Sequence, residues 1–144
     1  MTAQLRCLPV IGRILIALIF VISGFGKIAA PAMTQGYIAS VGLPLPLVAY
    51  LIAIVVEIGG GILLVVGFQT RIVALVMAAF TVATALCFHH DFGDQNQMIH
   101  FLKNIAMTGG LLQIVAFGAG SFSIDSRREE SLNSASAHSY SSRA

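Results

Sequence analysis

Apolar residues gather along the chain into four long runs that are separated by short polar stretches. A helix needs about 20 mostly apolar residues to cross the hydrocarbon core of a bilayer, which is roughly 30 Å thick. We expect four transmembrane helices, over residues 8–28, 45–68, 72–88 and 99–118. The pattern therefore predicts an all-α fold, an integral membrane bundle of four transmembrane helices.

The stretches between these runs are short and carry turn-forming or polar residues. Residues 29–44 contain two prolines and two glycines, and the half-apolar part over 33–41 predicts a short helix along the membrane surface. A tight turn over 69–71 joins the second and third runs, and a polar loop over 89–98 joins the third and fourth.

The last part of the chain differs in character from the rest. After Asp125 the sequence is rich in serine and shows no apolar periodicity. Segments of this composition bury too little apolar surface to fold alone. We therefore expect one transmembrane domain over residues 1–125 and a disordered, Ser-rich cytoplasmic tail over residues 126–144.

Composition supports a membrane protein and excludes several other classes. Of the 144 residues 57% are hydrophobic and 10% are charged, against about 25% charged residues in ordinary soluble domains. So few charges cannot cover the surface of a small soluble domain. The net charge of +2 and the absence of a Lys/Arg run argue against a nucleic-acid partner. The partner that composition indicates is the lipid bilayer.

Basic residues are distributed unevenly between the two sides of the predicted bundle. Four spans place both termini on one side, and the basic residues on or near that side are Arg6, Arg13, Arg71, Arg127, Arg128 and Arg143. The opposite side has Lys27 and Lys103 at helix ends, together with Asp91 and Asp94. Cytoplasmic loops carry the excess of Lys and Arg, so we expect both termini in the cytoplasm.

The first run also has features of a signal peptide, because Arg6 precedes it and small residues follow it. We favour a membrane span, since Lys27 stands where a cleavage region is neutral and three more spans follow.

The two cysteines, Cys7 and Cys87, fall near opposite ends of spans and form no CxxC pair. A disulfide between them within one chain is therefore not expected.

One carboxylate, Glu57, falls at the centre of a predicted span. An ionised carboxylate is costly at that depth, so it must be protonated, paired or exposed to water. The candidate polar cluster consists of Glu57 and the groups that can approach it, namely Lys27, Lys103, Asn104, Arg13 and Tyr50. Two interpretations stay open: a buried pair that fixes helix register, or a group that carries protons or binds substrate.

A second candidate cluster lies at the expected outer mouth of the bundle and contains His89, His90 and His100. Adjacent histidines on a helix point to different faces, so at most one of His89 and His90 serves a given site. Their spacing matches no zinc or di-metal signature, and we expect no metal site. Either they form a partly solvated interfacial set, or they mark a proton entry or a site for a quinone head group.

Several short motifs, taken in order, resemble the DoxX family of small membrane proteins. They are Gly12-Arg13, Ser23 to Lys27, Gly42-Leu43-Pro44, Glu57 to Gly61, Gly67 to Arg71, Phe88-His89, Phe101 to Ile105, Gly109 to Leu112, and Gly118 with Ser123 to Asp125. The resemblance covers nearly all of the chain except the tail. It implies a four-helix protein of the bacterial inner membrane. It also implies a link to quinone, because some relatives are associated with quinone-linked oxidation of sulfur compounds.

Three functions are compatible with these features. The first is an accessory or quinone-interacting subunit of a membrane oxidoreductase, with quinone as the cofactor and a membrane or periplasmic oxidoreductase as the partner. Without a cysteine pair, redox work would need that partner or a bound cofactor. The second is a structural or scaffolding membrane protein without catalysis of its own. The third is a small proton-coupled transporter that uses Glu57, and each of the three could act as a homo-oligomer.

Overall fold

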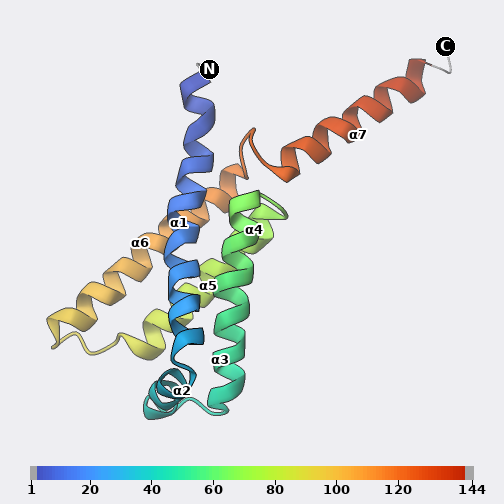
Figure 1. The fold of residues 1–144 in the computed structure, drawn as a ribbon. Coiled ribbons are helices and arrows are strands. Elements are labelled where there is room, and N and C mark those ends of the chain that lie inside the picture. Colours follow the sequence, from blue (N-terminus) through green and yellow to red (C-terminus); the bar gives the residue numbers. More distant parts are fainter. Residues whose placement is uncertain (1–2, 142–144) are drawn as a thin grey trace.

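The computed structural model describes residues 3–141, which form helices and connecting turns without a strand among them (Figure 1). The elements are α1 (Ala3–Ala29), α2 (Pro31–Ser40), α3 (Pro46–Ile54), the π-helical segment η1 (Val55–Gly60), α4 (Gly61–Val66), α5 (Thr70–Phe88), α6 (Gln95–Phe117) and α7 (Ile124–Ser141). Among them, four helical stretches are long and apolar enough to cross a membrane: Arg6–Ala29, Pro46–Val66, Thr70–Phe88 and Gln95–Phe117. The all-α prediction with four spans is therefore confirmed.

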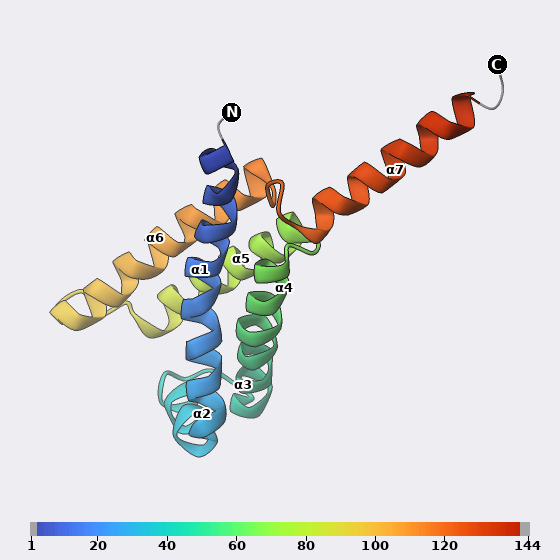
Figure 2. The same ribbon diagram turned by 45° about the horizontal axis from the view of Figure 1, so that its top comes forward.

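The second span is one continuous rod made of α3, η1 and α4, and it lies antiparallel beside α1 (Figure 1). Helices α5 and α6 form a hairpin that runs obliquely to that pair, as the turned view also shows (Figure 2). We call the end of the bundle where α2 lies the α2 end, and the end from which α7 leaves the α7 end. The start of α1 lies at the α7 end in both views.

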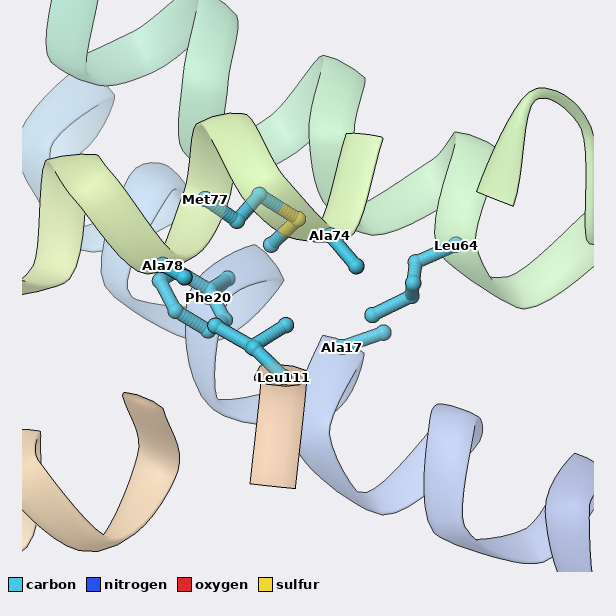
Figure 3. Close-up of a cluster of buried hydrophobic side chains, with 7 residues drawn as sticks. All are labelled: Ala17, Phe20, Leu64, Ala74, Met77, Ala78 and Leu111. Atoms are coloured by element: carbon cyan, nitrogen blue, oxygen red, sulfur yellow. The ribbon is translucent and has the colours of Figure 1, made fainter. Parts of the chain in front are cut away.

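The core lies where the four spans cross, and small residues let them approach closely. Its buried side chains are Ala17 and Phe20 of α1, Leu64 of α4, Ala74, Met77 and Ala78 of α5, and Leu111 of α6 (Figure 3). A Cβ atom on Gly61 would lie 2.6 Å from Val21 Cγ2 and 3.4 Å from the Ala17 carbonyl oxygen. Glycine at this position therefore lets α4 lie directly against the backbone of α1.

The short helix that the sequence predicted over 33–41 is present as α2. It begins at Pro31, whose fixed φ suits the first position of a helix. It packs against α3, and its one buried residue is Ile38. The helix thus covers one end of the bundle rather than adding a fifth span.

The tail was expected to be disordered over 126–144, but its described part belongs to helix α7 (Ile124–Ser141), which extends away from the bundle (Figure 1). Residues 142–144 lie outside the described residues. Ser123 caps its first turn, since the Ser123 Oγ atom accepts a hydrogen bond from the Ser126 N–H at 3.1 Å. The negative side chain of Asp125 lies in the first turn, where it interacts favourably with the positive end of the helix dipole. The local sequence therefore supports a helix although no apolar face packs it on the bundle. Arg143, used above for the expected orientation, lies outside the described residues.

Candidate functional site

An ion pair inside the bundle joins the first two spans. Lys27, in the last turn of α1, places its Nζ atom 2.8 Å from both Oε1 and Oε2 of Glu57. The same ammonium donates a hydrogen bond of 2.8 Å to Ser23 Oγ, one turn earlier on α1. The side chain of Glu57 is 7% exposed and that of Lys27 is 25% exposed. Lys27 is therefore the partner that the mid-span carboxylate requires.

Glu57 lies within η1, where the helix widens into π-helical turns. Such π segments in α-helices are frequent at functional sites. On the facing helix, a Cβ atom on Gly24 would lie 2.5 Å from Ile58 Cγ1 and 3.3 Å from Glu57 Cβ. The absence of a side chain on Gly24 thus brings α1 close enough for Lys27 to reach Glu57. Sequence patterns did not predict the π segment, and the glycines that follow Glu57 are a weak signal for it.

A cavity of about 640 Å³ lies beside the ion pair, between α2, α3 and α5. Most of its lining is apolar, with Met33, Ile38, Leu43, Ala49, Ile52, Ala53, Phe80, Ala83, Cys87 and Phe88. Polar groups are few, namely Lys27, Glu57, Thr34, Thr84, Tyr37 and His89. An apolar pocket of this size with a few polar groups is typical of a binding site for a small apolar molecule. We call it the α2-end cavity.

The other members of the predicted polar cluster lie apart from the carboxylate of Glu57. Tyr50 is buried, and its hydroxyl donates a hydrogen bond of 3.4 Å to the Lys27 carbonyl at the end of α1. Lys103 is exposed on α6, and the Asn104 carbonyl accepts a hydrogen bond from Thr108 in the same helix. The structure therefore pairs Lys27 with Glu57, bonds Tyr50 to the backbone of Lys27, and places Lys103 and Asn104 on α6.

Arg13, the remaining member of that cluster, lies at the α7 end and is 1% exposed. Its Nη1 atom donates to the Leu64 carbonyl at 3.3 Å, and its Nη2 atom donates to the Phe122 carbonyl at 2.6 Å. Its Nε atom is buried without a hydrogen-bond partner among the described residues. The guanidinium occupies the space that a side chain on Gly67 would need, and Gly67 itself has a φ of +71°. Arg13 thus joins α1, α4 and the 118–123 loop.

Asp125 completes this network at the start of α5. Its carboxylate accepts hydrogen bonds from the Gln69 N–H at 2.9 Å, the Thr70 N–H at 2.9 Å and the Thr70 hydroxyl at 2.7 Å. Partial burial opposes ionisation, but these hydrogen bonds and the charge of Arg13 outweigh it and lower the pKa of Asp125. The sequence did not predict this network, although Arg13, Thr70 and Asp125 fall within the motifs that carry the family resemblance.

The predicted histidine cluster divides into a pair and a separate residue. The His89 and His100 rings stack with centroids 5.0 Å apart, and His89 Nδ1 lies 2.9 Å from Gln97 Oε1. His90 is exposed, so one of the two adjacent histidines faces the α2-end cavity and the other does not. Among the described residues, no group of three or more His, Cys, Asp or Glu could hold a metal ion.

Comparison with known proteins decides the family. The DoxX family model matches residues 8–90, which is more than half of the chain. The chain belongs to the DoxX family. It is 41% identical over 118 residues to the inner membrane protein YqjF of Escherichia coli (strain K12), covering 80% of this chain and 87% of that protein.

A second relative is the inner membrane protein YphA of the same strain. It is 40% identical over 125 residues, covering 83% of this chain and 89% of YphA. No solved structure matches the chain. Together these matches confirm the resemblance seen in the motifs and identify a multi-pass protein embedded in the inner membrane.

Proposed function

We propose that this DoxX-family protein binds quinone in the inner membrane and serves as an accessory subunit of a membrane oxidoreductase system. The observation that carries the proposal is the α2-end cavity, with the Lys27–Glu57 pair in its mostly apolar wall. A quinone has an apolar ring and tail and carbonyl oxygens that accept hydrogen bonds. An apolar cavity of this size with a few polar side chains and one cationic side chain in its wall suits such a molecule.

A partner protein is part of this proposal. Cys7 and Cys87 lie in α1 and α5, and they do not form a dithiol that could pass electrons. In this proposal the electrons move between the bound quinone and a membrane or periplasmic oxidoreductase. The DoxX chain contributes the quinone site and the protonatable pair beside it.

Two other functions rest on the same pair. The complete hydrogen bonding of Lys27, with Ser23 and both oxygens of Glu57 as acceptors, favours a structural role. A proton-coupled transporter would use Glu57 as the group that is protonated and released. If the role is structural, filling the cavity should not change the amount of quinone that co-purifies with the protein. If the protein is a transporter, it should carry a solute flux that Glu57→Gln abolishes.

Filling the cavity tests the proposal. Ala83 lines the cavity and Ala79 lies one turn earlier on α5 without lining it, and both are exposed. We expect Ala83→Phe to reduce the quinone that co-purifies with the protein by about tenfold or more, because the new ring occupies the binding space. Ala79→Phe, the matched control, should retain the wild-type content. The measurement is chromatography of quinone extracted from purified protein, and equal content in the two variants would contradict the proposal.

We also propose that both termini are cytoplasmic, following the basic residues at the α7 end. Cys7 and Cys87 then face opposite sides of the membrane. A membrane-impermeant thiol reagent should leave the exposed Cys7 unmodified in intact spheroplasts and modify it once the cells are lysed. Modification of Cys7 in intact spheroplasts would reverse the proposed orientation.

A further inference from the structure

His89 lies at the end of α5 and lines the same cavity as the Lys27–Glu57 pair. Two contacts hold its ring in place. One face stacks on His100 of α6, with ring centroids 5.0 Å apart. Its Nδ1 atom lies 2.9 Å from Oε1 of Gln97, in the first turn of α6.

The bond to Gln97 decides what His89 can offer a ligand. Nδ1 is engaged by the Gln97 amide, so Nε2 is the ring nitrogen left for a ligand, and with the ring proton on Nδ1 it accepts a hydrogen bond. Gln97 is itself positioned by the start of α6, where Asp94 accepts hydrogen bonds from the Asn96 and Gln97 N–H groups at 2.7 and 3.4 Å. The start of α6 therefore places Gln97 beside His89 Nδ1.

The cavity wall next to His89 suits a flat ring. The rings of Tyr37 and Phe88 lie 5.4 Å apart and both line the cavity. The Tyr37 hydroxyl donates a hydrogen bond of 3.5 Å to the Phe88 carbonyl. A ring that lies against these aromatic side chains has His89 and the Lys27–Glu57 pair in the same cavity wall.

These observations separate the two redox forms of a quinone. A carbonyl oxygen cannot donate to His89 Nε2, whereas the hydroxyl of the reduced form can. We propose that His89 is a specificity-determining residue that makes the α2-end cavity favour the quinol over the quinone. This inference rests on the proposed function and adds to it the redox state of the ligand.

The test uses Cys87, which lines the cavity two residues before His89, as a reporter of occupancy. Purified protein in nanodiscs is treated with iodoacetamide under anaerobic conditions, with a fully substituted decyl benzoquinone or its quinol present. Mass spectrometry follows alkylation of Cys87, with the exposed Cys7 as internal reference. We expect half-protection at a quinol concentration about tenfold below that of the quinone, as one buried hydrogen bond allows.

Variants at His89, Gln97 and His90 show which side chain causes the difference in protection between quinol and quinone. His89→Phe should abolish the difference between the two forms, and Gln97→Leu should weaken it, because Nδ1 loses its fixed acceptor. His90→Phe, on the exposed neighbour, should leave the difference unchanged, and the melting temperature of each variant checks its folding. Equal protection by both forms in the wild type, or a difference that survives in His89→Phe, would overturn the role of His89 alone. Protection by neither form would overturn the proposed function as well.

Discussion

Replacing Lys27 with methionine is expected to lower the melting temperature of the purified protein in detergent by roughly 10 °C. The change leaves the buried carboxylate of Glu57 without its cation and without the two hydrogen bonds of 2.8 Å that the ammonium donates. Breaking one partner of a buried pair typically costs about 3 kcal/mol or more, which corresponds to such a shift in a domain of this size. Lys103→Met is the matched control, since Lys103 is an exposed lysine on α6, and should change the melting temperature by about 1 °C or less.

A double variant tests the Lys27–Glu57 pair more directly than the single variant. In the double variant Lys27→Met, Glu57→Leu no unpaired charge remains, so most of the lost stability should return. Thermal unfolding of the wild type, Lys27→Met, Glu57→Leu and the double variant forms a double-mutant cycle. The cycle isolates the interaction between the two side chains. If Lys27→Met melts like the wild type, the two side chains do not form the pair described here.

Arg13→Met is expected to have an effect of similar size at the opposite end of the bundle. Arg13 is 1% exposed, and its loss leaves the Leu64 and Phe122 carbonyls without their donor and Asp125 without its positive neighbour. Unsatisfied buried groups cost about 1–3 kcal/mol each, so we expect a decrease of roughly 10 °C in thermal unfolding.

A basic residue at the same end supplies the control for Arg13. Arg71 is exposed at the start of α5, and Arg71→Met should therefore leave the melting temperature within about 2 °C of the wild type. Arg13→Lys should keep only part of the stability. An ammonium cannot reach both carbonyls from two separate nitrogen atoms as the planar guanidinium does. Equal melting temperatures for Arg13→Met and Arg71→Met would contradict the network.

The spans were predictable because the bilayer imposes a length and an apolar composition on any helix that crosses it. Glu57 was identifiable for the same reason, as a charge in the middle of such a run. The partner of Glu57 was not identifiable, because pairing depends on the register of α1 along the second span. That register is set by the contacts of Gly24 with Ile58 and of Gly61 with Val21, which hydropathy does not encode.

The network at the α7 end escaped prediction for a different reason. Arg13 and Phe122 are 109 residues apart, and Thr70 and Asp125 are 55 apart. Contacts between helix ends and loops have no periodic signature, so a sequence pattern cannot pair them. The cavity was equally hidden, since its wall combines α2, α3 and α5 through apolar residues that resemble those facing lipid.

A quinone in the cavity beside Lys27 and Glu57 is what the proposed function requires. The most direct measurement is photolabelling of the membrane-embedded protein with an azido-substituted quinone, followed by mass-spectrometric mapping of the modified residues. We expect labels on the cavity walls, within residues 33–57 and 80–89, and we expect excess unlabelled quinone to remove them. Labels confined to the exposed apolar face of α6, or labels that excess quinone does not displace, would contradict the proposed function.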